Sequence, residues 1–343
     1  MSQGCATMPH ALLRVLLLSA AVAWPAQGLT ARDFSRSLAF APRMTSLFPE
    51  GQVPGPHTQA GAGTHGRGLF STEEREETRY LRRICQVEGF GPTYRYFDVE
   101  TPGLDETFVL ERPSSRAAVL VVPGGARLYL GWEREGTKTA EWLNSLNISA
   151  FVLKYRVPSS ESRAAFMDVE RAMSMVRSRA PELGIDTDRI GVIGFSAGGA
   201  LAAWVSGNEI RSYVRIDEID DVPFKPNFQL LVYADTPEAA GQKLPTTFMA
   251  HAEDDPCVPQ ARTEAYCRAV KQVAHQSCTR FLYPNGGHGV GVCTGTWAPG
   301  FPHTPGPRGA VNGMDGWYNT WSGDALCGWF HEAEKWLGHV GVI

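Results

Sequence analysis

One segment, residues 190–206, limits the possible folds more than any other part of this chain. It starts as a short apolar run, passes through Gly194-Phe-Ser196-Ala-Gly198, and continues as an alanine-rich stretch. Gly-x-Ser-x-Gly between a strand and a helix is typical of a nucleophile elbow, a sharp turn that exposes the serine. We expect Gly194 and Gly198 here because a side chain at either position would collide across the bend. The segment predicts Ser196 as a nucleophile; an ordinary glycine-rich turn is the alternative.

Short apolar runs alternate with longer amphipathic ones from residue 93 onward. This alternation indicates an α/β fold, with a mostly parallel central sheet and helices on both faces. The first two runs, residues 93–99 and 107–111, are expected to form an antiparallel pair. Buried strands are predicted at 117–122, 150–155, 190–194, 228–232, 246–251 and 279–282, and helices at 136–146, 163–179, 197–206, 260–272 and 326–337.

The loop after the strand predicted at 246–251 supplies an acid for a catalytic triad. Three acidic residues stand together there, Glu253, Asp254 and Asp255. We assign Asp255 as the acid, because the Asp-x-x-Val-Pro spacing places its carboxylate where the loop turns into the next helix. Asp254 is the alternative, and the other acidic side chains are expected to face solvent or to cap that helix.

A glycine-flanked histidine, His288, follows the next predicted strand and is assigned as the base. It would take the proton of Ser196 and return it to the leaving alcohol, while Asp255 orients the ring. Serine, aspartate and histidine follow one another in the order found in α/β-hydrolases. Ester turnover should therefore fall in acid, as the imidazole becomes protonated. Another histidine, His251, is interpreted as the end of a strand.

An acyl-transfer site also needs backbone donors for the oxyanion that forms on the substrate. Residues 121–126 form a glycine-containing loop after a predicted strand, and we assign donors at Ala197 and at Gly125 or Ala126. A simple turn at the strand end is the alternative. The sequence has no histidine–glutamate pair at helical spacing, no Cys-x-x-Cys pair and no dinucleotide or P-loop fingerprint, so neither a metal nor another cofactor is expected.

The N-terminal part of the chain differs from the rest. Residues 1–28 have the layout of a secretory signal peptide, with an apolar run too short to span a bilayer, so no membrane span is expected after its removal. Residues 29–75 are rich in proline and glycine and are interpreted as a linker or targeting extension, expected to be disordered. Residues 76–343 are assigned to one catalytic domain. The expected destination is the secretory pathway or the extracellular space. A plastid reached through a bipartite leader is the alternative, because residues 38–42 resemble a phenylalanine-containing cleavage motif.

Charge and cysteine content narrow the possible partners and compartments. The chain has 32 Lys and Arg against 36 Asp and Glu, a formal net charge of -4, and no run of five like charges, which argues against a nucleic-acid partner. Its seven cysteines include one in the predicted leader, and the even number that follows permits disulfides. We expect these in the C-terminal third, with buried free cysteines as the alternative. The sequence indicates no oligomeric state.

As a set, these motifs resemble the α/β-hydrolases grouped with bacterial acetylxylan esterases and related carbohydrate acetyl or feruloyl esterases. The resemblance covers roughly residues 117–337 and rests on 121–125, Glu135-Gly136, 151–156, Asp168 with Arg171-Ala172, 189–199, 225–228, Asp255 and 286–289. It implies the α/β-hydrolase fold and a mechanism with Ser196, Asp255 and His288 on small acyl esters.

Two positions depart from the pattern of that family. A third glycine and a tyrosine usually follow its Pro-Gly-Gly loop, whereas this chain has Ala126 and Arg127, which would narrow the acyl side or offer a cation to an acidic sugar. Asn147 stands where a glycine commonly ends a helix. Asparagine tolerates the left-handed conformation, and residues 147–149 also form a glycosylation sequon.

The expected function is hydrolysis of short-chain carboxylic esters, with acetylated carbohydrate as a candidate substrate. Residues 208–222 are the candidate insertion near the cleft, and they are too short and polar for a lipase-like lid, which disfavours long acyl chains. Four aromatic residues after the base either stack on sugar rings or only cover the sheet edge: Trp297, Trp317, Tyr318 and Trp321. The alternatives are a serine peptidase or amidase of the same fold and a non-catalytic binding protein on a hydrolase scaffold.

Overall fold

The computed structural model describes residues 42–55, 65–71, 78–79, 85, 93–159, 162–239, 243–292 and 326–343. The predicted signal peptide lies outside these ranges. All the described residues belong to one unit of the chain, made of residues 42–295 and 303–343.

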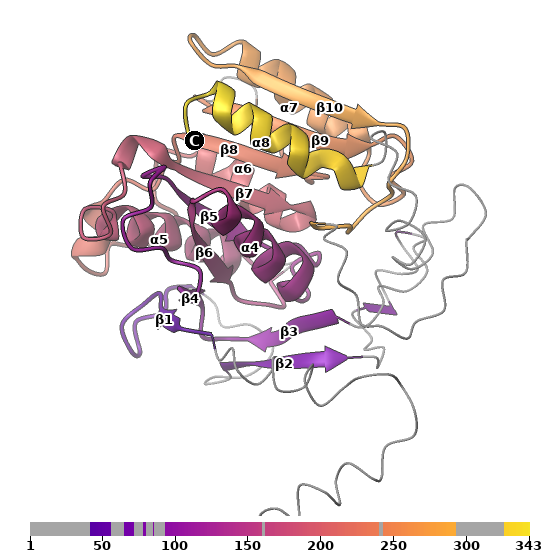
Figure 1. The fold of residues 1–343 in the computed structure, drawn as a ribbon. Helices are drawn as coiled ribbons and strands as arrows, with labels where there is room; N and C mark the ends of the chain where they lie inside the picture. The colour runs from indigo at the N-terminus through magenta and orange to yellow at the C-terminus, as the bar shows by residue number, and fades with distance from the viewer. Residues whose placement is uncertain are drawn as a thin grey trace, which may run out of the picture. The chain divides into compact units, whose positions relative to one another are not determined.

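An eight-stranded, mostly parallel sheet organises this unit, with the strands in the order β1-β4-β6-β5-β7-β8-β9-β10 (Figure 1). The strands are β1 Met44–Ser46, β4 Gly103–Asp105, β5 Ala118–Val122, β6 Ser149–Lys154, β7 Ile190–Phe195, β8 Phe228–Val232, β9 Thr246–Ala252 and β10 Cys278–Tyr283. From β6 to β10 neighbouring strands pair in parallel, and β1 and β4 add an antiparallel edge. Every residue of β5, β6, β7 and β8 is buried, as expected for strands covered on both faces.

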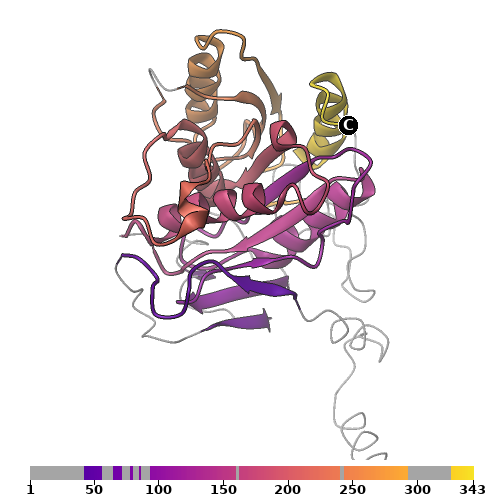
Figure 2. The same cartoon turned by 90° about the vertical axis from the view of Figure 1, so that its left-hand side faces the viewer.

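Helices cover both faces of this sheet, as predicted. They are the π-helix η1 Trp132–Thr137, α4 Lys138–Ser145, α5 Ala164–Arg179, α6 Ser196–Gly207, α7 Gln260–Lys271 and α8 Trp329–His339. Adjacent residues of a strand point to opposite faces. A side chain at Gly194 of β7 would meet Ala202 of α6, whereas the ring of Phe195 lies 5.8 Å from that of Trp329 in α8. Figure 2 likewise shows α7 (orange) and α8 (yellow) on opposite sides of the strands.

The antiparallel pair expected between residues 93–99 and 107–111 does not form. β3 Thr93–Val99 pairs instead with β2 His65–Ser71 in a separate two-stranded sheet. Asp105 ends β4, and its Oδ1 accepts hydrogen bonds from the backbone N–H of Thr107 at 2.9 Å and from the hydroxyl of the same residue at 2.5 Å. This local turn leads the chain out of the strand, because the side chain takes over the role of a ladder partner.

β1 and β2 fall within residues 29–75, the segment interpreted as a linker or targeting extension. β1 pairs with β4 along the edge of the main sheet, and Leu47 and Phe48 directly after it are buried. Backbone pairing at a sheet edge needs no apolar period, so proline and glycine content gave the wrong expectation for these residues. The domain boundary at residue 76 stays a prediction.

Asn147 adopts the conformation that the sequence predicts. Its φ of 62° lies in the left-handed region, just after α4 ends. Its Oδ1 accepts a hydrogen bond from the backbone N–H of Ser114 at 2.7 Å. The helical stretch begins earlier than the predicted residue 136, because η1 precedes α4. None of the helices that the structure describes is long and apolar enough to cross a membrane.

Two disulfides lie among the described residues. Cys267–Cys278 joins α7 to β10 in the C-terminal third, where disulfides were expected. Cys85–Cys257 joins residues 172 positions apart and so reaches outside that third. Cys327 is also disulfide-bonded.

Candidate active site

Ser196 occupies a sharp turn between β7 and α6. Its φ is +50°, a conformation that side-chain-bearing residues adopt at a cost of about 1–3 kcal/mol and that is often found at functional sites. Glycines make the bend possible: a Cβ at Gly194 would lie 2.5 Å from the carbonyl oxygen of Gly198, and one at Gly198 would lie 2.3 Å from that of Pro123. The local sequence therefore raises the serine hydroxyl above the end of the strand.

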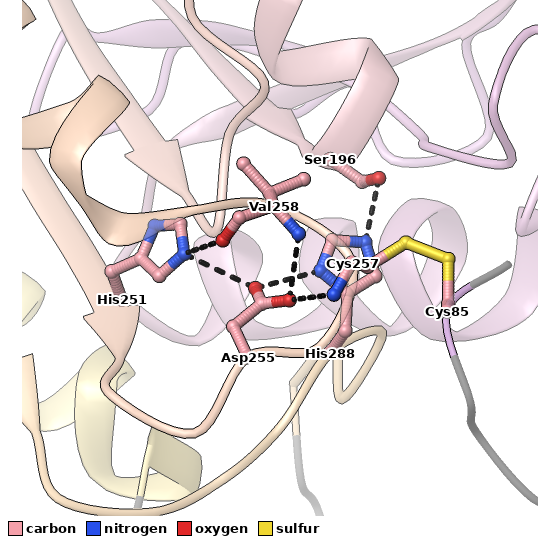
Figure 3. Close-up of a disulfide and its surroundings, with 7 residues drawn as sticks. All are labelled: Cys85, Ser196, His251, Asp255, Cys257, Val258 and His288. Carbon is pink, nitrogen blue, oxygen red and sulfur yellow. Dashed lines mark hydrogen bonds and ion pairs between the residues drawn. A yellow bond between two sulfur atoms is a disulfide. The ribbon is translucent and has the colours of Figure 1, made fainter.

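The structure brings Ser196, His288 and Asp255 into one hydrogen-bonded chain (Figure 3). Ser196 Oγ lies 2.8 Å from His288 Nε2, and His288 Nδ1 lies 2.8 Å from Asp255 Oδ2. Because a carboxylate faces Nδ1, this nitrogen carries the ring proton, and Nε2 is left to accept from the serine hydroxyl. The arrangement can move a proton from the hydroxyl to the ring.

Asp255 follows β9 and is held by hydrogen-bond donors on both oxygens. Its Oδ1 accepts from the backbone N–H groups of Cys257 at 2.8 Å and Val258 at 2.9 Å. Burial would raise the pKa of this carboxyl, but hydrogen bonds from His251 and His288 outweigh it and hold the pKa well below its ordinary value. Asp255 therefore remains a carboxylate beside the imidazole.

The alternative acid, Asp254, has a different contact. Its Oδ1 accepts a hydrogen bond from the backbone N–H of Gly287 at 2.8 Å. Asp254 thus ties the acid loop to the loop that carries His288, rather than contacting the ring itself.

His251 was interpreted from the sequence only as a strand end, yet it contacts the acid. Its fully buried Nε2 lies 2.9 Å from the carbonyl oxygen of Val258 and 3.1 Å from Asp255 Oδ2. Both neighbours are acceptors, so Nε2 must carry the proton and donate to them. A histidine four residues before the acid, at the end of an apolar strand, is the signal that would have pointed to this contact.

Glu135 connects two loops around the serine, a function that the sequence motifs did not reveal. Its Oε2 accepts from the backbone N–H of Gly124 at 2.7 Å, and its Oε1 accepts from the hydroxyl of Tyr233 at 2.8 Å. The Tyr233 oxygen in turn accepts from the N–H of Gly291 at 2.8 Å, and the Tyr233 ring lies 4.9 Å from that of His288. Burial raises the pKa of Glu135, although these hydrogen bonds oppose the rise.

The loop predicted to supply the oxyanion donors lies beside the serine. β5 and β7 pair in parallel with Val122 opposite Gly194, so the loop after β5 and the elbow emerge at the same edge. Gly125 and Ala126 line a cavity with Ser196. Ala197 is not among the lining residues, but its N–H belongs to the first turn of α6, where N–H groups have no partner within the helix.

This cavity has a volume of about 60 Å³. It is lined by Cys85, Thr93, Arg95, Gly125, Ala126, Tyr129, Gly131, Arg134, Glu135, Ser196, Cys257, His288 and Gly289. The cation considered from the sequence, Arg127, is not one of these residues, because its guanidinium lies over the ring of Phe166 and donates to the carbonyl of Ser159. Arg95 and Arg134, only 5% and 6% exposed, are the arginines at the cavity.

The segment expected as an insertion near the cleft, residues 208–222, does not line the cavity. Its Asp217 and Asp220 pair with Arg171 of α5 at 2.6 and 2.9 Å. The four aromatic residues considered for sugar stacking, at positions 297, 317, 318 and 321, lie outside the described residues. Within the part of the chain that the structure describes, no three histidine, cysteine, aspartate or glutamate side chains are grouped to hold a metal ion.

Comparisons with known proteins find esterases among the similar proteins. Residues 111–218 match the protein family described as BD-FAE. The acetylxylan esterase of Xylanibacter ruminicola is 29% identical over 223 residues, which cover 55% of this chain and 44% of that esterase, so the chain spans less than half of its relative.

Solved structures show the same fold. An acetyl ester-xyloside bifunctional hydrolase from Caldicellulosiruptor lactoaceticus superposes with a TM-score of 0.54 at 26% identity, covering 71% of this chain and 89% of that one. MGS-M1, an α/β hydrolase from a deep-sea metagenome library, superposes with a TM-score of 0.52 at 24% identity, covering 71% and 93%.

Proposed function

We propose that this chain, an α/β-hydrolase that resembles bacterial acetylxylan esterases, is a serine esterase that hydrolyses short-chain carboxylic esters through an acyl-Ser196 intermediate. The observation that carries the proposal is the chain of two 2.8 Å contacts from Ser196 through His288 to Asp255. A nucleophile within hydrogen-bond reach of a base, with a third residue that orients the base, is the diagnostic arrangement for acyl transfer to serine.

In the proposed reaction, His288 Nε2 accepts the proton of Ser196 as Oγ attacks the ester carbonyl. Negative charge forms on the carbonyl oxygen, facing the N–H of Ala197 and that of Gly125 or Ala126. His288 then gives its proton to the leaving alcohol. In the second half, His288 deprotonates a water that attacks the acyl carbon, and then gives this proton to Ser196 Oγ as the acyl–Oγ bond breaks and the acid leaves. Asp255 stays ionised and stabilises the imidazolium.

The cavity supports a short acyl group. An apolar cavity of about 150 Å³ can hold a benzene ring, and the cavity at Ser196, about 60 Å³, is less than half that size. An acetyl group fits this space better than an octanoyl chain. We extend the proposal to removal of acetyl groups from carbohydrate, for which the names of two similar proteins, an acetylxylan esterase and an acetyl ester-xyloside hydrolase, are the support.

We also propose that the protein works in the secretory pathway or outside the cell. Its disulfides fit an oxidising compartment. The plastid alternative depends on a leader that lies outside the described residues.

The test compares wild type with Ser196→Ala in the release of p-nitrophenol from acetate, butyrate and octanoate esters, and in the release of acetate from acetylated xylan. We expect acetate to be the best ester and the variant to lose at least about 10³-fold in kcat. An active wild type whose activity survives Ser196→Ala would overturn the assigned nucleophile. A wild type inactive on every ester would favour the amidase or the binding-protein alternative.

A further inference from the structure

The Cys85–Cys257 disulfide is attached to the loop that carries the acid. Cys257 stands two residues after Asp255, and its backbone N–H donates to Asp255 Oδ1 at 2.8 Å. The next residue, Val258, donates to the same oxygen and accepts from His251. The disulfide therefore holds Cys257 in place, and the N–H of Cys257 in turn holds the carboxylate of Asp255 (Figure 3).

The same disulfide forms part of the wall of the cavity. Cys85 and Cys257 both line the cavity that contains Ser196. Cys85 is buried in a small cluster with Phe97 and Tyr129, against which Ala126 and Cys257 pack. The N–H of Tyr129 donates to the carbonyl of Gly125 at 3.2 Å, so this cluster also contacts the oxyanion loop.

Apart from the disulfide, hydrogen bonds hold the acid loop. The N–H of Glu253 donates to the carbonyl of Tyr283 at 2.8 Å, and Asp254 Oδ1 accepts from the N–H of Gly287 at 2.8 Å. The N–H groups of Cys257 and Val258 donate to Asp255 Oδ1. If the disulfide opened, Cys257 would keep the hydrogen bond from its N–H to Asp255 Oδ1 but lose its covalent tie to Cys85, and the loop would gain freedom to move. A displacement of the Asp255 carboxylate by even 1 Å would orient the ring of His288 poorly.

We propose that Cys85 and Cys257 are positioning and specificity-determining residues, whose disulfide holds the loop of Asp255 in place and limits the size of the acyl pocket. The proposal rests on the esterase function proposed above. The second disulfide, Cys267–Cys278, joins α7 to β10 and does not line the cavity, so it provides a matched control.

The experiment compares three proteins: wild type, Cys85→Ser/Cys257→Ser and Cys267→Ser/Cys278→Ser. For each we would measure kcat and KM on p-nitrophenyl acetate and butyrate, at a temperature at which circular dichroism shows the protein folded. In the first variant we expect kcat on acetate to fall roughly tenfold, which corresponds to a loss of about 1.4 kcal/mol, and the butyrate-to-acetate ratio of kcat/KM to rise. The control should keep the kcat and the ratio of wild type, although it unfolds at a lower temperature.

The second arm of the experiment is reduction of the wild-type protein. It tests the proposal even if the Cys85→Ser/Cys257→Ser variant does not fold. A dithiol such as dithiothreitol would transfer two electrons and two protons to the Cys85–Cys257 bond, giving two thiols and its own cyclic disulfide. Wild type and the control variant should lose activity and recover it on reoxidation with oxidised glutathione. Cys85→Ser/Cys257→Ser should not respond, and a response in that variant would assign the effect to another disulfide and overturn the proposal.

Hydrogen exchange separates failure of this proposal from failure of the esterase function. The peptide that contains residues 253–258 should exchange faster in Cys85→Ser/Cys257→Ser than in wild type or control, whatever the substrate is. If the exchange of residues 253–258 did not change, or if the acyl preference shifted equally in both variants, the proposal would be wrong. The Cys85–Cys257 disulfide would then only stabilise the fold in general. A wild type without esterase activity but with faster exchange in the first variant would reject the proposed reaction and keep the positioning role.

Discussion

At the scale of single residues, the oxygen Oδ2 of Asp255 accepts from two imidazoles, His288 at 2.8 Å and His251 at 3.1 Å. The first belongs to the proposed triad, and the second comes from the strand that precedes the acid. His251 is fully buried and donates through Nε2, so it restrains the carboxylate oxygen that also faces His288.

We predict that His251→Phe lowers kcat on p-nitrophenyl acetate roughly tenfold, because a hydrogen bond to a charged group contributes about 1.5–3 kcal/mol. His251→Gln is the matched variant, since its amide N–H can reach the same oxygen. It should retain most of the activity at similar KM. Equal losses in the two variants would point to packing of the ring rather than to the hydrogen bond.

The residues that could be predicted from the sequence are those marked by local pattern and chain order. Ser196 has its glycines on either side, and Asp255 and His288 each follow a recognisable strand. Glu135 belongs to a motif of the family resemblance, but its contact could not be predicted, because its partner Tyr233 is 98 residues away and the two meet only once the chain has folded. The two arginines at the cavity were missed for the same reason.

At the scale of elements, strands buried on both faces were predicted well because they are continuous apolar runs, as β5 and β7 are. Pairing was predicted poorly wherever it depended on backbone alone. β3 was expected from its composition, but its partner β2 was not, since nothing in residues 65–71 alternates between apolar and polar. The acidic segment 208–222 was placed near the cleft because the sequence does not show that Arg171 binds it.

Arg171 provides a prediction about how α5 is fixed to its neighbours. Its side chain is 3% exposed, pairs with Asp217 and Asp220, and donates through Nε to the carbonyl of Leu47 at 2.8 Å. Arg171→Met removes the cation that pairs with Asp217 and leaves Asp220 with Arg211 alone, at 3.3 Å, so we expect the free energy of unfolding in urea to fall by about 3 kcal/mol. Activity of the folded fraction should stay unchanged, because Arg171 does not line the cavity.

Arg215→Met is the control for that prediction. Arg215 pairs with Asp221 on the surface, where both side chains are more than half exposed, so removing this pair should leave the free energy of unfolding almost unchanged. If both variants unfold at the same urea concentration, the buried pair is not the anchor of α5.

At the scale of the whole molecule, the carboxyl groups predict how stability depends on pH. Hydrogen bonds with Arg171 hold the pKa of Asp217 below its ordinary value. Burial would raise the pKa of Asp220 and Asp255, but their hydrogen bonds outweigh it and lower both. A carboxyl group whose pKa is lower in the folded chain than in the unfolded chain stabilises the fold at pH values above its pKa in the unfolded chain, about 3.9 for aspartate. This stabilisation is lost as the pH falls through its pKa in the folded chain.

Glu135 acts in the opposite direction, because burial raises its pKa. Glu135 contributes to the free energy of unfolding below the pKa that it has in the unfolded chain, about 4.3. This contribution is lost as the pH rises through the pKa that it has in the folded chain. Burial also raises the pKa of Asp105 and Asp168, whereas the hydrogen bond with Arg215 lowers the pKa of Asp221. The lowered groups make the free energy of unfolding decline below about pH 4, and the raised groups place its maximum in weakly acidic solution rather than at pH 7. Urea unfolding at pH 7, 5 and 3 measures this curve.

Asp217→Asn tests whether these carboxyl groups cause the decline. An asparagine cannot gain stability by ionising, so the variant should be less stable than wild type at pH 7 and the difference should shrink toward pH 3, where the wild-type carboxylate also begins to take up a proton. A difference that stays constant over this range would mean that the Asp217 side chain stabilises the fold by its shape and hydrogen bonds, and that its charge contributes nothing.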